Sequence, residues 1–224
     1  MTTVEERIPY DVMDVSGSWM KTFSPKPGFK LRTLSGGRWN GMSKRCNGKE
    51  TRWKGSHYKF CQNGFSNFDE FAEWSMSQFG YRMRNTNGSF FHLDKDILSP
   101  GNTIYSPERC CFVSSRINNL IFTSYRKNND LPIGVCKQLN CRTYTARANR
   151  DGKLIQLGGF YDPMEAHHAW QRFRADEIAR VSLIELRDGR INKRIYEALI
   201  NISEIFMNDA SNGQQTNFRM NSDD

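Results

Sequence analysis

FFHLDKDILSPGNTIYSPERCCFVSSRINNL, residues 90–120, carries the densest chemistry in this 224-residue sequence. Four polar side chains fall within five residues of it: His92, Asp94, Lys95 and Asp96. A segment broken by proline and glycine follows, and Asn118 comes next in a stretch expected to be helical. Hydrolysis of a phosphodiester needs a hard cation and a group that activates water. Carboxylate and amide oxygens suit a magnesium ion that keeps most of its waters, so the stretch predicts metal-dependent chemistry on a phosphodiester.

The same stretch resembles the ββα-metal motif of HNH (His-Me finger) nucleases, in which a hairpin carries an acidic ligand and a base and the next helix returns a second ligand. It is most similar to phage homing endonucleases with an LDKD…GN…YSPE.C.FV…IN pattern. The matching residues are Leu93 to Asp96, Gly101 and Asn102, Tyr105 to Glu108, Cys110, Phe112, Val113, Ile117 and Asn118. The element HLDKD is also similar to the HLDHD element of phage Holliday-junction resolvases.

The resemblance implies roles for the polar residues of the motif. Asp94 falls on the acidic metal ligand and Asn118 on the helical ligand, for one divalent cation that is Mg²⁺ or alternatively Mn²⁺. Where the family usually has the histidine that activates water, this chain has Lys95, and an ammonium is a poor base unless its surroundings lower its pKa. His92 could be the base, or it could be a ligand, because it shares a strand face with Asp94. A shifted register that uses Asp96 as the aspartate of a DHxDG form places an aliphatic side chain on the metal and is disfavoured.

The residues before this motif divide into an arm and the start of a domain. Residues 1–35 are rich in Gly, Ser and Pro and show no sustained period, so we expect an N-terminal arm with short local structure. A helix is expected from near Ser66, with Ser66 as its cap and an aromatic face that serves as core. Residues 36–125 are therefore predicted to form the HNH-like nuclease domain.

The residues after the motif predict a second module. Three short apolar runs, PIGVCKQ (132–138), CRTYTARA (141–148) and KLIQLGGF (153–160), predict a three-stranded antiparallel sheet. Asp162, Pro163 and Glu165 are typical of a helix start, with Asp162 as cap and Glu165 placed for a capping box. Apolar residues at helical spacing over 191–206 predict one further helix, within 189–207, whose partner is open. The tail, residues 208–224, is polar and is expected to be disordered.

Residues 131–181 resemble the plant-type APETALA/ethylene-response-factor DNA-binding domain through IGV, the alternating R-x-Y-x-A run, LGGFYDP and EAHHAW. The resemblance implies a sheet in the DNA major groove, backed by one helix, over residues 130–183. Alternation puts Arg142, Tyr144, Ala146 and Ala148 in one phase and Thr143, Thr145 and Arg147 in the other. The residues expected to contact DNA are Lys137, Arg142, Tyr144, Arg150 and Lys153.

Composition agrees with a polyanionic partner. The 32 Lys and Arg against 24 Asp and Glu give a net charge of +8 and a pI near 9.3, which favours binding to a phosphate backbone. Neither a membrane span nor a signal peptide can be read, so a cytoplasmic location is expected, in the host cell if the chain is phage-encoded. Six cysteines are then reduced thiols, and because none forms a CxxC pair a structural zinc site is disfavoured.

Together these patterns predict an α+β protein with a ββα-metal nuclease module plus a three-stranded antiparallel sheet with one packing helix. The predicted function is divalent-metal-dependent DNA cleavage, with phage homing as the role that the resemblance implies. The alternative is a non-catalytic, sequence-specific DNA-binding protein derived from an HNH nuclease, which Lys95 supports; an RNA-binding structural protein is a further rival. Double-stranded DNA is the expected partner, with no membrane and no small-molecule cofactor. The oligomeric state, recognition sequence and number of strands cut stay open.

Overall fold

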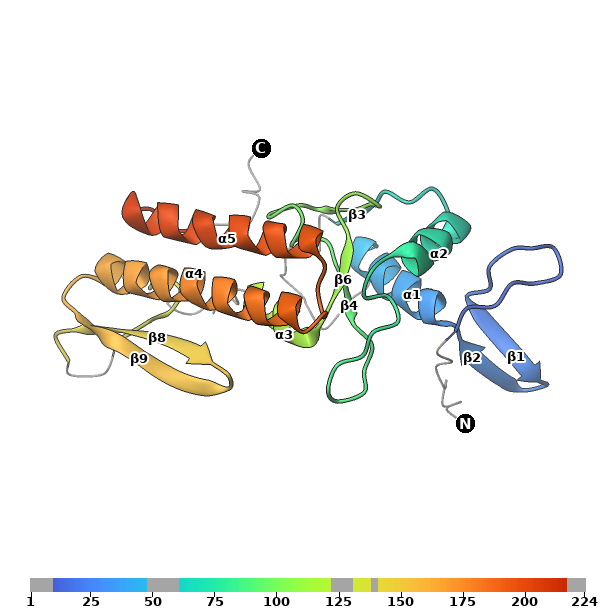
Figure 1. The fold of residues 1–224 in the computed structure, drawn as a ribbon, viewed down its shortest axis with the longest axis horizontal. Coiled ribbons are helices and arrows are strands. Elements are labelled where there is room, and N and C mark those ends of the chain that lie inside the picture. The colour runs from blue at the N-terminus through green and yellow to red at the C-terminus, as the bar shows by residue number, and fades with distance from the viewer. Residues whose placement is uncertain (1–9, 48–60, 122–130, 138–140, 217–224) are drawn as a thin grey trace. The chain divides into compact units, whose positions relative to one another are not determined.

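The computed structural model describes residues 10–47, 61–121, 131–137 and 141–216. These residues form helices and small sheets, which confirms the α+β class (Figure 1). The chain divides between Ser114 and Ser115 into an N-terminal unit and a C-terminal unit, each described by itself below. The predicted metal ligands Asp94 and Asn118 therefore belong to different units. The sequence, in contrast, predicts one domain of residues 36–125 that contains both.

The first two strands of the N-terminal unit form a β-hairpin. Strands β1 (Thr22–Lys26) and β2 (Phe29–Arg32) pair antiparallel, and helix α1 (Leu34–Cys46) follows directly. Thr33 caps α1, because its side-chain oxygen accepts a hydrogen bond from the backbone N–H of Gly36 at 3.1 Å. The expected N-terminal arm thus contains an ordered ribbon that stands at the start of a helix.

Helix α2 (Phe68–Ser77) starts one residue later than its expected cap predicts. The cap is Asn67, whose Oδ1 accepts from the N–H of Glu70 at 2.9 Å, while the Glu70 carboxylate accepts from the N–H of Ser66 at 2.6 Å. Ser66 is therefore not the cap, because Asn67 is the residue that stands three positions before this glutamate. The expected aromatic face is confirmed as core, since Phe68 and Phe71 are buried.

Two short strand pairs carry the polar motif. Strand β3 (Gln62–Asn63) runs parallel to β5 (Ile104–Tyr105), and β4 (His92–Asp94) runs antiparallel to β6 (Cys111–Val113). The aromatic core beside these strands includes Leu34, Tyr81, Phe91 and Phe112. Buried thiols, Cys61 and Cys110, belong to a second cluster with Met42, Phe65 and Phe71, so these cysteines act as small apolar side chains.

The C-terminal unit contains the predicted sheet. After helix α3 (Ser115–Ile121), strands β7 (Val135–Lys137), β8 (Tyr144–Arg150) and β9 (Lys153–Phe160) form an antiparallel sheet in the order β7-β8-β9. The prediction of a three-stranded antiparallel sheet is confirmed. A bulge lies between Ala146 and Arg147 of β8, where the pairing with β9 shifts.

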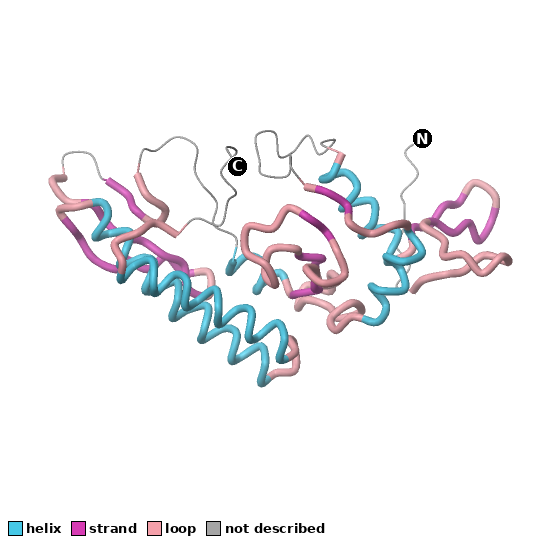
Figure 2. The backbone as a smooth tube through the Cα atoms, turned by 90° about the horizontal axis from the view of Figure 1, so that it is seen from above, coloured by secondary structure: helices cyan, strands magenta, loops and turns pink. Residues whose placement is uncertain are grey.

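Two long helices complete the C-terminal unit. Helix α4 (Pro163–Arg187) lies between the sheet and α5 (Lys193–Ser211), which runs alongside it (Figures 1 and 2). Asp162 caps α4 as expected, although it accepts from the N–H of Met164. The partner of the C-terminal helix, left open by the sequence, is α4. Residues 208–211 of the predicted tail continue α5. Beyond the helix, the side-chain amide of Gln171 donates hydrogen bonds to the backbone oxygen of Gln214 and the hydroxyl of Thr216. Residues 217–224 lie outside the described residues.

Glycine 134 is expected to be indispensable for packing the sheet on α4. Its φ is +81°, and a Cβ built on it would lie 2.1 Å from Cγ of Trp170. Gly152 has the same φ of +81° but no atom within 4 Å of such a Cβ, so it is a matched control. Gly152→Ala should cost about 1–2 kcal/mol from backbone strain alone. Gly134→Ala should cost roughly 3 kcal/mol more in urea unfolding, and equal losses would contradict the close approach.

None of the described helices is long and apolar enough to cross a membrane. The expected cytoplasmic location stays a prediction.

Candidate nuclease site and nucleic-acid face

Asp94 ends strand β4 and closes the loop that follows it. Its Oδ1 accepts hydrogen bonds from the backbone N–H groups of Asp96 at 2.8 Å and Ile97 at 2.9 Å. Within the residues that the structure describes, Oδ2 accepts no hydrogen bond. Burial and the negative charge of Asp96 raise the pKa of the Asp94 carboxyl above its usual range. A positive ion beside Oδ2 would offset the cost of holding this carboxylate ionised, so Asp94 is suited to be a ligand of a cation.

Lys95 is almost fully buried, at 2% exposure, and its ammonium is used inside the loop. Nζ donates to Oδ1 of Asp96 at 2.6 Å and to the backbone oxygen of Asn102 at 2.5 Å. Such pairing satisfies a buried cation and joins the two ends of the loop. The contacts of Lys95 are therefore those of a residue that stabilises the loop rather than of an acid–base group. Its predicted catalytic role stays untested.

Asn102 is the centre of this loop, which sequence reasoning noted only as part of the GN pattern. Its Nδ2 donates to the backbone oxygens of Lys95 at 3.0 Å and Ile104 at 2.6 Å. Its Oδ1 accepts from the N–H of Ile104 and from Nη1 of Arg109, both at 2.9 Å. The amide links the start of the loop to β5 and so fixes where Asp94 and Asp96 lie. An asparagine after glycine was the available signal, but only the fold shows how many groups it joins.

His92 lies two residues before Asp94 on β4, opposite Val113 of β6, and its side chain is exposed. Alternation along the strand gives both side chains the same face, as expected. Partial loss of water around the ring, together with the positive charges of Arg38 and Arg45, lowers the pKa of His92. The imidazole is therefore neutral near pH 7, which is the form that accepts a proton or binds a metal.

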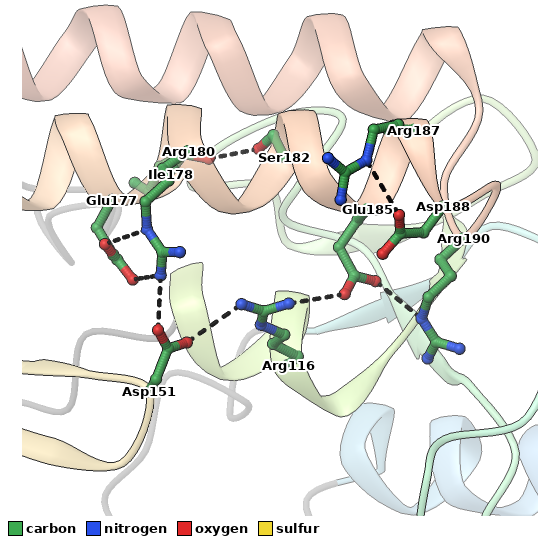
Figure 3. A network of polar contacts seen from close by, with 10 residues as sticks. All are labelled: Arg116, Asp151, Glu177, Ile178, Arg180, Ser182, Glu185, Arg187, Asp188 and Arg190. Atoms are coloured by element: carbon green, nitrogen blue, oxygen red, sulfur yellow. Dashed lines mark hydrogen bonds and ion pairs between the residues drawn. The ribbon is translucent and has the colours of Figure 1, made fainter.

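Asn118 lies in α3, which an ion-pair network holds within the C-terminal unit (Figure 3). Arg116 of this helix contacts Glu185 of α4 at 3.4 Å and Asp151 of the β8–β9 turn at 3.2 Å. Arg174 of α4 also donates to the backbone oxygen of Leu120. The network makes α3 part of the body that carries the sheet. Asp94 belongs to the N-terminal unit, so convergence of Asp94 and Asn118 on one ion stays a prediction.

The same network extends along α4 through a buried carboxylate. Glu177, at 2% exposure, accepts from Arg150 at 2.8 Å and from Arg180 at 2.5 Å. Figure 3 shows the contact with Arg180, which also pairs with Asp151. Burial opposes ionisation, but the hydrogen bonds and charges of the two arginines hold the pKa of Glu177 below its usual range. These pairs tie the β8–β9 turn to the supporting helix.

The packing of α4 decides which face of the sheet is open. Ala146 is fully buried and Ala148 nearly so, and Arg150 in the same phase bonds Glu177 and lies 4.6 Å from the ring of Phe173 in α4. The strand face that was predicted to contact DNA thus faces α4, and Tyr144 packs against the core cluster of Val135, Ala146 and Ala166. The open face instead includes Arg147, Asn149, Leu154 and Gln156, whereas Thr145, in the same phase, is buried.

The signal for this face was present in the sequence. Small apolar residues such as Ala146 and Ala148 permit a helix to approach closely, so their phase marks the covered face. Arg147 is opposite Gln156, and Asn149 is opposite Leu154, which is 69% exposed. The sequence-based prediction missed these residues, because it assigned DNA contact to the phase that contains Arg142 and Tyr144.

The remaining predicted DNA contacts lie at the rim of the sheet. Lys137 is exposed, with Nζ 3.5 Å from Oη of Tyr144 and 4.8 Å from its ring centroid. Arg142 and Lys153 are exposed and make no ion pair with any described residue. These three cations remain available to a phosphate backbone, unlike Arg150.

Among the described residues, no three His, Cys, Asp or Glu side chains gather in a way that could hold a metal ion. Compared with known proteins, the chain matches no family model, no curated protein and no solved structure. Both family resemblances therefore stay predictions, and so do the activity, metal and partner that they imply.

Proposed function

We propose that this protein is a divalent-metal-dependent DNA endonuclease of the HNH type, with phage homing as its biological setting. The observation that carries the proposal is Asp94, which commits Oδ1 to its own loop and leaves Oδ2 for a cation. The order of elements agrees with the proposal, since an antiparallel strand pair, β4 with β6, is followed directly by helix α3.

The residues proposed to hold the cation are Asp94 and Asn118, which offer a carboxylate and an amide oxygen. These ligands suit Mg²⁺ or Mn²⁺, and such an ion supplies charge stabilisation at the scissile phosphate when bound. His92 stands beside Asp94 on the same strand face, its side chain is exposed and it is neutral near pH 7, which makes it the better placed of the two candidate bases. Lys95 and Asn102 hold the loop in shape, so that the carboxylate is presented in one position.

The proposed DNA grip is the open face of the β7–β9 sheet with the rim cations around it. The major groove of B-DNA is about 12 Å wide and admits a two-stranded ribbon, such as β8 paired with β9. Arg147 and Gln156 lie opposite each other on this face, and both side-chain types bond base edges. The +8 net charge supplies the sequence-independent attraction to phosphates.

Two arginines on opposite faces of β8 give a paired test of this grip. Arg147→Gln should weaken duplex binding by about 1–3 kcal/mol, roughly 5- to 150-fold, without changing the melting temperature. Arg150→Gln removes one partner of the buried Glu177 carboxylate, so it should lower stability by about 1–2 kcal/mol and leave affinity unchanged. Fluorescence anisotropy and thermal melting measure the two effects. Reversal of the pattern would place the DNA face on the α4 side.

The nuclease proposal is tested by nicking of a supercoiled plasmid with Mg²⁺, with Mn²⁺ and with EDTA. Cleavage that needs the cation and yields relaxed or linear plasmid is expected. Plasmid that stays supercoiled in every metal would overturn the enzymatic assignment.

The second candidate is a non-catalytic DNA-binding protein. The burial of Lys95 favours it, because the position that holds the water-activating histidine in the resembling family here holds a structural cation. This candidate predicts tight duplex binding with no cleavage in any metal, and His92→Ala would then have no effect on any property of the complex except a small change in affinity.

A further inference from the structure

The β1–β2 hairpin is an amphipathic ribbon. Thr22 pairs with Arg32 and Phe23 pairs with Leu31, so opposite residues share a face. Leu31 is buried on one face of β2. Lys30 and Arg32 lie on the opposite face, where Lys30 is exposed. Lys26 is exposed at the tip, beside the turn. One face of the ribbon therefore carries the buried Leu31, with Lys26 opposite Phe29 at the tip, and the other face carries Lys30 and Arg32.

The stretch of sequence that contains this ribbon carries charge of one sign. Residues 15–49 contain eight lysines and arginines and no aspartate or glutamate: Lys21, Lys26, Lys30, Arg32, Arg38, Lys44, Arg45 and Lys49. Within the part of the chain that the structure describes, neither Lys26 nor Lys30 is ion-paired with a carboxylate; Lys26 lies 5.3 Å from the ring centroid of Phe29. These ammonium groups are solvated and available to an external anion.

The base of the ribbon is clamped to α1, so its position is set before any partner binds. The Thr33 hydroxyl donates to the backbone oxygen of Met20 at 2.7 Å, and the Thr33 N–H donates to the oxygen of Lys21 at 3.2 Å. Gly36 makes this approach possible, because a Cβ there would lie 2.1 Å from the Lys21 oxygen. Figure 1 shows the two strands leaving the start of α1 as a ribbon. A fixed ribbon loses little conformational freedom on binding.

We infer that this hairpin is a second DNA-binding element, which contacts the phosphate backbone of a duplex through Lys26 and Lys30 in addition to the grip of the β7–β9 sheet. The inference rests on the proposed DNA-cleaving function and adds a contact that belongs to the N-terminal unit.

Two observations favour duplex DNA over a protein strand as the occupant. Pro25, Pro27 and the lysines lie in and beside the ribbon, and proline and lysine are the residues that discourage addition of a further strand at an edge. A two-stranded ribbon also fits the major groove of B-DNA, whereas the major groove of duplex RNA is too narrow and deep to admit it.

The test compares the salt dependence of duplex binding for three proteins, by anisotropy in EDTA so that no cleavage occurs. They are the wild type, the K26Q/K30Q variant, and a control, R187Q/K193Q, which removes the same charge from exposed positions in the other unit. Loss of two phosphate contacts should reduce the slope of log K against log salt by about 1.8 and weaken binding roughly 10- to 100-fold at low salt. The control should keep the wild-type slope, and K26R/K30R should restore it.

The outcomes separate this inference from the proposed function. If the wild type nicks plasmid and K26Q/K30Q keeps the wild-type slope, the hairpin inference is overturned and the endonuclease stands. If the wild type binds but never nicks, and the slope falls, the hairpin is supported although the nuclease proposal fails. Duplex RNA that competes as well as duplex DNA overturns the choice of occupant. Circular dichroism melts identify any variant that is unfolded, and K26R/K30R then decides whether charge at these positions is needed.

Discussion

Replacement of Asp94 by asparagine is expected to lower the metal-dependent nicking rate by at least about 10³-fold, some 4 kcal/mol of transition-state stabilisation. The substitution is nearly isosteric, and the asparagine oxygen can still accept from the N–H groups of Asp96 and Ile97. The loop is therefore retained while the charge that attracts the cation is lost. Single-turnover nicking measures the effect, and anisotropy should show unchanged duplex affinity.

A matched control exists in the same unit. Asp14 also closes a turn through Oδ1, which accepts from the N–H groups of Ser16 at 2.9 Å and Ser18 at 3.0 Å. Asp14→Asn should leave nicking at the wild-type rate. If Asp94→Asn nicks as fast as the Asp14 control, Asp94 is not a metal ligand.

The stability of the Asp94 variant provides a second readout that does not depend on cleavage. Because the pKa of Asp94 is raised in the folded chain, its ionised form is less favourable there than in the unfolded chain at pH 7. In EDTA the asparagine variant should therefore melt at the same temperature as the wild type or higher. Added Mg²⁺ should raise the melting temperature of the wild type alone, because a ligand stabilises the state that binds it. An equal rise in both proteins would contradict a site at Asp94.

Lys95→Met is expected to destabilise the N-terminal unit by roughly 2–4 kcal/mol, which lowers its melting temperature on the order of 10 °C. The substitution keeps the length of the side chain but leaves the backbone oxygen of Asn102 without its donor and Asp96 without its cation. The loss is smaller than for a fully buried pair, because the Asp96 side chain is 36% exposed and stays partly solvated. Thermal and urea unfolding measure the change.

This variant also decides between two roles for Lys95. Lys30→Met, at an exposed position of the same unit, should leave the melting temperature unchanged. A Lys95→Met protein that melts like the wild type yet cannot nick DNA would make Lys95 an acid–base group and would remove the structural interpretation given to its contacts.

Much of the C-terminal unit could be predicted because its signals are local. Asp162 and Pro163 mark the start of α4 by their own backbone preferences, which act within one turn. Turn residues separate three β-prone runs, and the strands form where those runs lie. The apolar period of α5 correctly placed Ile195, Leu199 and Phe206 in the core. No long-range information was needed for any of these.

Other features depended on groups far apart in the sequence. Proline and glycine hid the β1–β2 hairpin, which is stable because Thr33 and Gly36 give it a platform on α1. The packing partner of α5 could not be predicted, because an apolar helix face indicates that the face is buried but not which element covers it.

The sequence by itself determined the α+β class, the three strands, the two long helices and the polar residues of the motif, because caps, turns and alternation are properties of neighbouring residues. The tertiary structure alone decided that Lys95 is buried against Asn102 and that α4 covers the Ala146 face of β8, so that Arg150 pairs with Glu177 and Arg147 lies on the face away from α4. Alternation separates the two faces of a strand but assigns neither of them to solvent, and only the packing of a distant helix makes that choice.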